Sequence, residues 1–333
     1  MPHEPRRRTS YPGGALRPRH RPASTRLLRP RSGAFGTRPA QRPGGHHRWT
    51  YYTRENQLSG AAGEDTLDQW IPGLGFTWDF GGDYTLFGGV HRGFSPPRAE
   101  DLIDNHGGTV DVDAEESLNL ELGVRGQFGQ DLALEAAWFR TDFSNQVVVG
   151  SIAGGSTPLA QGETLYQGVE LALDWSDDGG FGLPGTPYAR AALTWLGTAE
   201  QQTAFIAVSN GQPIAGSGDG RRLPYAPKGL ATLAAGYRQG PWDGLVEMQA
   251  VDDQYADFAN TTSPVANGSG QFGRIAGFAV WNLTLNWIPD PAAGWSAFVA
   301  IKNAGDREYI VDRTRGIQLG NPRQYVAGMR YAF

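Results

Sequence analysis

The sequence has no cysteine, only three methionines and no long apolar run. The absence of cysteine excludes disulfide bonds, thiolate metal sites and cysteine nucleophiles. A transmembrane helix needs about 18 or more consecutive apolar residues, and no such stretch occurs. Strands in which polar and apolar residues alternate can still cross a bilayer as part of a barrel.

Glycine and aromatic residues are abundant, with 47 Gly, 10 Trp, 12 Tyr and 15 Phe. This composition is typical of many aromatic-rich strands joined by turns. The last predicted strand shows the pattern most clearly, because one of its faces carries Tyr325, Ala327, Met329, Tyr331 and Phe333. The opposite face is mixed and includes Gln324 and Arg330. Such a strand suits lipid on one side and a polar lumen on the other.

The first 48 residues differ sharply in charge from the rest of the chain. Residues 1–48 carry 12 Arg and one acid, a net charge of +11, whereas residues 49–333 have a net charge of −16. We expect residues 1–48 to be a disordered Arg/Pro-rich segment. A GC-rich gene that is translated out of frame also produces an amino-acid sequence of this composition. A basic tail for nucleic acid or anionic lipid is the alternative. Arg6–Arg8 is not followed by the apolar stretch of a secretory signal.

From Trp49 onward one predicted strand follows another. The expected strands are 70–80, 83–93, 116–128, 130–144, 164–175, 187–198, 228–238, 242–252, 275–288, 294–303 and 321–333, with 49–58 as a twelfth candidate. In the strand 116–128, the residues on one face are Leu118, Leu120, Leu122 and Val124. Aromatic residues lie near many predicted strand ends, as in the girdles of membrane barrels. They are Trp70, Trp78, Phe80, Trp138, Trp175, Trp195, Trp287, Trp295, Tyr331 and Phe333.

Short and long connections alternate between these strands. The long connections are expected at 94–115, 145–163, 199–227, 253–274 and 304–320. Alternate connections of an up-and-down meander lie at the same end, so the long ones gather at one rim. We therefore predict an all-β, antiparallel up-and-down transmembrane β-barrel over residues 49–333, with about 11–12 strands, the C-terminal half of a barrel of about 22 strands. The alternative is a soluble all-β carbohydrate-binding or adhesion module, which rarely has so many long loops.

Two segments resemble a known family. Residues 71–98 (IPGLGFTWDFGGDYTLFGGVHRGFSPPR) resemble the C-terminal barrel of TonB-dependent outer-membrane receptors, in particular the ferric citrate receptor branch. Residues 303–333 are similar to the closing hairpin of that family, with an N-x-x-D-x-x-Y motif, a G-x-P-R entry and a terminal aromatic. Those positions are Asn303, Asp306, Tyr309, Gly320, Pro322, Arg323 and Phe333. The resemblance covers roughly residues 65–333.

This resemblance implies uptake of an iron chelate, ferric citrate or another siderophore, across the outer membrane of a Gram-negative bacterium. The partners it implies are the TonB–ExbB–ExbD complex, outer-membrane lipid and lipopolysaccharide, and the barrel assembly machinery. We expect no nucleic-acid partner and no cofactor, since the ferric chelate would be cargo. No segment matches a plug domain or TonB box, so we expect a plug-less portion of a receptor. A porin-like barrel is a further alternative.

Ferric chelates such as citrate complexes are anionic. The planar guanidinium group of arginine binds a carboxylate through two parallel hydrogen bonds. The predicted ligand-binding residues on the long connections are Arg98, Arg221, Arg222, Arg313 and Arg315. The alternative is that they bind lipopolysaccharide phosphates or pair with nearby acids. The set His91, His106, Asp101 and Asp104 fits no standard metal pattern, and no G-x-S-x-G motif occurs. We therefore expect neither a metal site nor an enzyme.

Overall fold

The computed structural model is all-β throughout the residues that it describes. These residues are 40–55, 60, 62–95, 114–148, 159–177, 179–209, 212–264, 268–289 and 294–331. They form one 12-stranded antiparallel sheet and three two-stranded sheets. Within them, no helix has the length and apolar character needed to cross a membrane.

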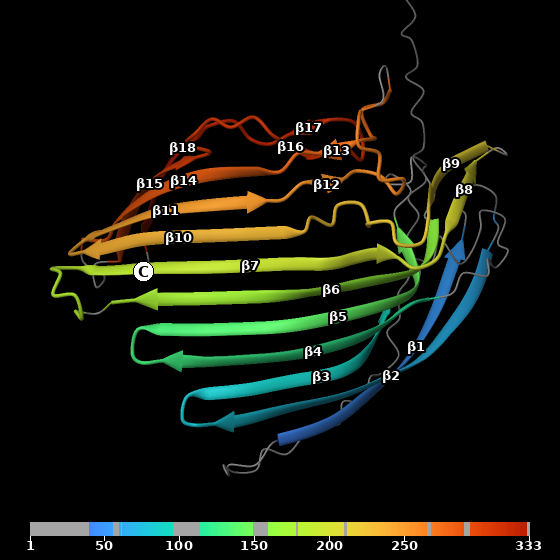
Figure 1. Ribbon diagram of the computed structural model, residues 1–333, viewed down its shortest axis with the longest axis horizontal. Coiled ribbons are helices and arrows are strands. Elements are labelled where there is room, and N and C mark those ends of the chain that lie inside the picture. Colours follow the sequence, from blue (N-terminus) through green and yellow to red (C-terminus); the bar gives the residue numbers. More distant parts are fainter. Residues whose placement is uncertain are drawn as a thin grey trace, which may run out of the picture.

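The large sheet is a meander in which the strand order follows the chain. Its strands are β1 (Ala40–Glu55), β2 (Ala62–Phe80), β3 (Tyr84–Ser95), β4 (Glu115–Phe128), β5 (Leu132–Val148), β6 (Leu159–Ser176), β7 (Thr186–Gln201), β10 (Gly229–Gln239), β11 (Trp242–Val251), β14 (Phe278–Trp287), β15 (Trp295–Lys302) and β18 (Gln324–Tyr331). The sheet curves into a wall (Figure 1). The all-β class and the antiparallel meander predicted from the sequence are confirmed.

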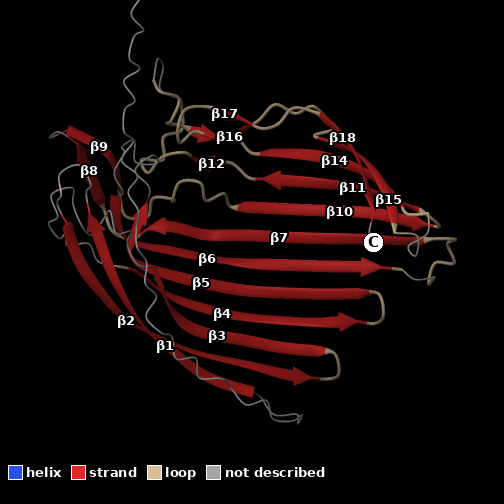
Figure 2. Cartoon of the chain, turned by 180° about the vertical axis from the view of Figure 1, so that it is seen from behind, coloured by secondary structure: helices blue, strands red, loops and turns tan. Residues whose placement is uncertain are grey.

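The two ends of this wall differ in their connections. Strands β2, β4, β6, β10 and β14 end at the left in Figure 1, and few residues separate each of them from the next strand of the sheet. The opposite end carries the long connections together with the short connection 56–61 between β1 and β2, and Figure 2 shows the same two ends of the wall from behind. Three long connections contain small hairpins that alternation did not predict: β8 (Phe205–Ser209) with β9 (Gln212–Ser217), β12 (Gln254–Tyr255) with β13 (Arg274–Ile275), and β16 (Ile310–Asp312) with β17 (Gln318–Leu319). We call the two ends the short-turn rim and the long-loop rim.

Strand pairing aligns the apolar residues into rows on one face. In one row Leu122 pairs with Trp138, Trp138 with Val169, and Val169 with Trp195. These four side chains remain between 36% and 61% exposed. A continuous exposed apolar surface is the signature of a sheet that contacts lipid, whereas a soluble sandwich would cover it. We call this the lipid face.

The opposite face, which we call the luminal face, is charged. Arg125 is aligned with Glu135, and the Arg190 guanidinium lies 2.9 Å from the Asp174 carboxylate. Aromatic rings also lie over glycines of the neighbouring strand there: Phe87 over Gly123, Phe139 over Gly168, Tyr188 over Gly236 and Phe298 over Gly328. A Cβ on any of these glycines would overlap the ring. Such ring-on-glycine contacts help to fix the register of a strand pair.

Aromatic rings gather on the lipid face near the short-turn rim. The ring centroids of Trp242 and Trp287 are 6.4 Å apart, and those of Trp295 and Tyr331 are 4.6 Å apart. Trp287, Trp295 and Tyr331 belong to the girdle predicted from the sequence. Rings at this level suit the interface between lipid tails and headgroups. Phe333, another predicted member, lies outside the described residues.

The structure moves one expected boundary. Strand β1 begins at Ala40, so residues 40–48 of the segment expected to be disordered are part of the sheet. The strand contains Pro43, which lacks an N–H donor, but β1 is an outer strand of the sheet. Proline is tolerated on outer strands because one side of the backbone needs no ladder partner. Residues 1–39 lie outside the described residues, and their expected disorder stays a prediction.

Candidate ligand-binding site on the long-loop rim

Three connections meet at the long-loop rim. They are 202–228 between β7 and β10, 252–277 between β11 and β14, and 303–323 between β15 and β18. The hairpin segments β12, β13, β16 and β17 lie together at this end of the wall in Figure 1, and Figure 2 shows β12, β16 and β17 together from behind. We call the described parts of these three connections the loop cluster. Four of the five predicted ligand-binding arginines lie in it.

Arg222 fastens the first connection to the barrel and to the second connection. Its Nε donates to the main-chain oxygen of Ala226 at 2.7 Å, and its Nη2 donates to that of Leu196 in β7 at 2.9 Å. Its main chain also exchanges two hydrogen bonds with the Asn260 side chain, at 2.9 and 2.7 Å. Burial lowers the pKa of the Arg222 guanidinium. The side chain therefore holds loop backbone in place.

Arg313 also binds loop backbone, in this case from the third connection, and it is only 4% exposed. Its Nη1 donates to the main-chain oxygen of Gly270 in the second connection at 2.9 Å. Close by, the Gln271 side chain donates to the main-chain oxygen of Thr314 at 2.7 Å. The second and third connections are thus joined by two hydrogen bonds that each use a side chain and a main-chain oxygen.

Tyr225 contacts the other two connections from the first one. Its main-chain N–H donates to the Tyr255 oxygen at 2.9 Å, and its hydroxyl accepts from the Arg313 N–H at 3.1 Å. Burial, with a further contribution from Asp312, raises the pKa of Tyr225 to about 12. The sequence did not single out this residue, because it lies in a Pro-rich loop without periodicity.

The third connection is closed by the motif on which the family resemblance partly rests. The Asn303 side-chain amide donates to the main-chain oxygens of Arg307 and Asn321 at 2.9 and 3.0 Å, and its Oδ1 accepts from the Arg307 N–H at 2.9 Å. The Asp306 carboxylate accepts from the Arg323 N–H at 2.9 Å. These contacts bring the beginning and the end of the connection together, so the motif shapes the loop that carries Arg313.

The predicted ligand-binding residues divide into two groups. The guanidinium groups of Arg222 and Arg313 contact main-chain oxygens inside the loop cluster. Arg221 and Arg315 are exposed at its surface. Arg221 donates to the main-chain oxygen of Ala259 at 2.6 Å, which uses one of its five N–H donors. Arg98 lies outside the described residues.

One further charged pair at this rim involves the second connection. Arg274 forms an ion pair with Asp253 at 2.5 Å, and the hydrogen bond from Arg274 lowers the pKa of Asp253. His91 lies in β3, whereas His106, Asp101 and Asp104 fall outside the described residues. Among the residues that the structure describes, no group of three or more His, Cys, Asp or Glu side chains could hold a metal ion.

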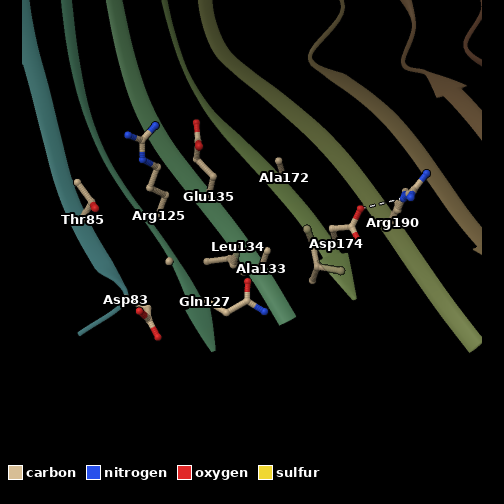
Figure 3. Close-up of a pocket in the computed structure, with 12 residues that line it drawn as sticks. Asp83, Thr85, Arg125, Gln127, Ala133, Leu134, Glu135, Ala172, Asp174 and Arg190 are labelled. Atoms are coloured by element: carbon tan, nitrogen blue, oxygen red, sulfur yellow. Dashed lines mark hydrogen bonds and ion pairs between the residues drawn. The ribbon is translucent and has the colours of Figure 1, made fainter. Parts of the chain in front are cut away.

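An open hollow of about 520 Å³ lies on the luminal face, toward the short-turn rim. Figure 3 shows Arg125 and Glu135 on adjacent strands in its wall, and Asp174 paired with Arg190. Because both signs of charge alternate along this wall, the hollow does not favour an anion over a cation. The exposed arginines of the loop cluster are therefore the better candidates for an anionic ligand.

Residues 44–304 match the family described as "TonB dependent receptor-like, beta-barrel". This is more than half of the chain, and the family's barrel architecture agrees with the meander and its two rims. The chain belongs to this family of TonB-dependent receptor β-barrels. Its members are transport receptors of the Gram-negative outer membrane, not enzymes, as the sequence predicted.

Individual relatives are similar over part of their length. The ferrienterobactin receptor of Escherichia coli (strain K12) is 29% identical over 119 residues, which are 30% of this chain and 15% of that protein. The unliganded ferric citrate transporter FecA matches with a TM-score of 0.65 and 23% identity, over 89% of this chain and 43% of that one. The siderophore receptor PiuA of Acinetobacter baumannii also gives 0.65, at 18% identity, over 88% and 40%. The matches thus span less than half of each relative.

Proposed function

We propose that this chain forms barrel wall and outer loops of a receptor that captures an anionic iron chelate at the long-loop rim for import. The observation that carries the proposal is the exposure of Arg221 and Arg315 on an interlocked loop cluster, in a chain of this family. Relatives named for ferric citrate and ferrienterobactin support an iron chelate as the ligand class. Within this class we propose ferric citrate, a compact carboxylate complex that suits paired N–H donors.

The arginines would have two roles in this receptor. Arg221 and Arg315 would contact the chelate, together with Arg98. Arg222 and Arg313 would act by holding the loop backbone that presents them, since their guanidinium groups bind main-chain oxygens. Import would draw energy from the TonB–ExbB–ExbD complex of the inner membrane. The lipid face would contact outer-membrane lipid and lipopolysaccharide after insertion by the barrel assembly machinery.

The test is a titration of the full chain in detergent micelles with ferric citrate, followed by tryptophan fluorescence. We expect Arg221→Gln and Arg315→Gln each to weaken binding by about tenfold or more, the usual effect of losing a charge-assisted hydrogen bond. Arg330→Gln is the control, because Arg330 is an exposed arginine on β18 near the short-turn rim. Equal losses in all three variants would indicate general electrostatic attraction instead of a site.

A parallel titration with ferric enterobactin separates the ligand branches. Tighter binding of ferric citrate supports the ferric citrate branch, and tighter binding of ferric enterobactin supports a receptor for the same ligand as the ferrienterobactin relative. Binding of neither chelate would contradict the proposed function.

A further inference from the structure

We propose that Tyr225 couples the three connections of the loop cluster, so that they open and close as one unit. We further propose that it is a positioning residue for chelate capture, a part that rests on the proposed function. Tyr225 lies in the first connection, and its hydrogen bonds reach the second through Tyr255 and the third through Arg313. A single side chain and its backbone therefore join all three.

These hydrogen bonds complete a set of pairwise links. Arg222 and Asn260 join the first connection to the second. The contact between Arg313 and Gly270 joins the second to the third. The Tyr225 hydroxyl joins the third to the first, so each connection is held by both of the others. Removing one link of such a closed network weakens the remaining ones, because hydrogen-bond networks are cooperative.

The backbone of Tyr225 supports the same inference. Its φ of 55° lies in the left-handed region, which a non-glycine residue seldom adopts. An unfavourable conformation of this kind persists only where surrounding contacts hold it. Here the hydrogen bonds to Tyr255 and Arg313 fix the residue from its main chain and from its side chain. The backbone is thus locally strained at Tyr225, the residue that joins the three connections.

The hydrogen bond between Tyr225 and Arg313 lies close in sequence to the two arginines proposed to bind the ligand. Arg221 is four residues before Tyr225, and Arg315 is two residues after Arg313. The hydrogen bond between Tyr225 and Arg313 therefore holds together the two segments that carry the exposed guanidinium groups. Loss of this bond would leave both arginines in place on their own connections but would remove the direct link between those two connections.

The test is amide hydrogen exchange of the full chain in detergent micelles, comparing the wild type with Tyr225→Phe. This variant removes only the hydroxyl. We expect exchange across 303–323, including the Gly320 amide that bonds to Tyr309, to become about tenfold faster, the effect of one ordinary hydrogen bond. Tyr255→Phe is the matched control, since the Tyr255 hydroxyl makes no hydrogen bond within the described residues. A change at the Arg313 amide alone would overturn the coupling.

Trypsin cleavage after Arg313 gives a second readout that needs no ligand. Arg313 is buried in the wild type, and we expect faster cleavage there in Tyr225→Phe but not in Tyr255→Phe. Unchanged cleavage in both variants would count against coupling.

Ferric citrate titration then tests the positioning role. Faster exchange with weaker ferric citrate binding in Tyr225→Phe supports both parts of the proposal. Faster exchange with unchanged binding overturns the positioning role and leaves the coupling. If the wild type does not bind ferric citrate, the proposed function fails together with the positioning role, while the exchange result still decides the coupling.

Discussion

The ring of Tyr309 lies so close to Gly320 that a Cβ at position 320 would overlap it. The Gly320 N–H also donates to the main-chain oxygen of Tyr309 at 2.8 Å, and the ring packs on Phe278 with centroids 4.2 Å apart. The contact thus joins the two arms of the last connection and anchors them to the start of β14. Glycine at position 320 is required by this close approach.

We therefore expect Gly320→Ala to destabilise the last connection by about 1–3 kcal/mol, the usual cost of overpacking a filled site. Gly305→Ala in the same connection is the control, because a Cβ there would meet nothing within 4 Å. Amide exchange of residues 303–323 would measure the difference. Equal protection in the two variants would show that the Tyr309 ring can move aside at little cost.

The large sheet could be predicted from the sequence because its signals are local. Period-two alternation in strands such as Glu115–Phe128 and the alternation of short and long connections predict strands, faces and rims without knowledge of distant contacts. The start of β1 was missed, since the Pro- and Gly-rich residues 40–48 carry no strand signal. They are ordered by pairing with β2, which is a tertiary effect.

The loop cluster could be predicted only in part. Charge and loop position drew attention to Arg222 and Arg313, but not to the main-chain oxygens that they bind. Tyr225 was missed altogether, because its partner Arg313 is 88 residues away in the chain. Contacts of this kind depend on how three separate connections fold over one rim, and no local pattern encodes that arrangement.

Asn303→Asp tests the family motif. An aspartate would set a carboxylate oxygen against the main-chain oxygens of Arg307 and Asn321, where the amide now donates two hydrogen bonds. We expect a loss of about 2–4 kcal/mol in the free energy of unfolding, because the site is 4% exposed and would hold unpaired acceptors. Urea unfolding followed by tryptophan fluorescence would measure it.

Asp306→Asn is the reciprocal control for this change. Asp306 only accepts, from the Arg323 N–H, and asparagine retains an oxygen that can accept in its place. We expect this variant to lose less than about 1 kcal/mol. A comparable loss in both variants would mean that any change of charge in this turn is harmful, whatever its hydrogen-bonding pattern.

The loop cluster should weaken at high pH because of Tyr225. Burial raises the pKa of its phenol from 10.0 to about 12 in the folded state, so the folded state holds the proton more tightly than the open state. The contribution of Tyr225 to the stability of the closed loop cluster is therefore complete below pH 10 and is lost as the pH rises toward 12. An ultraviolet difference titration of the wild type against Tyr225→Phe isolates this phenol. A midpoint near 10.0 would show that the hydroxyl is not buried in solution.

The assignment of the two faces can be tested on neighbouring residues of β10. Leu233 is aligned with Met248 and Ala191 on the lipid face, whereas the exposed Thr232 is aligned with Gln249 and Ala192 on the luminal face. We expect Leu233→Arg to cost about 2–4 kcal/mol in a bilayer, the range measured for arginine near the midplane of barrel walls. Thr232→Arg should cost less than about 1 kcal/mol, since its side chain remains in water. Reversible unfolding in lipid vesicles would measure both, and the opposite order would place lipid on the charged face.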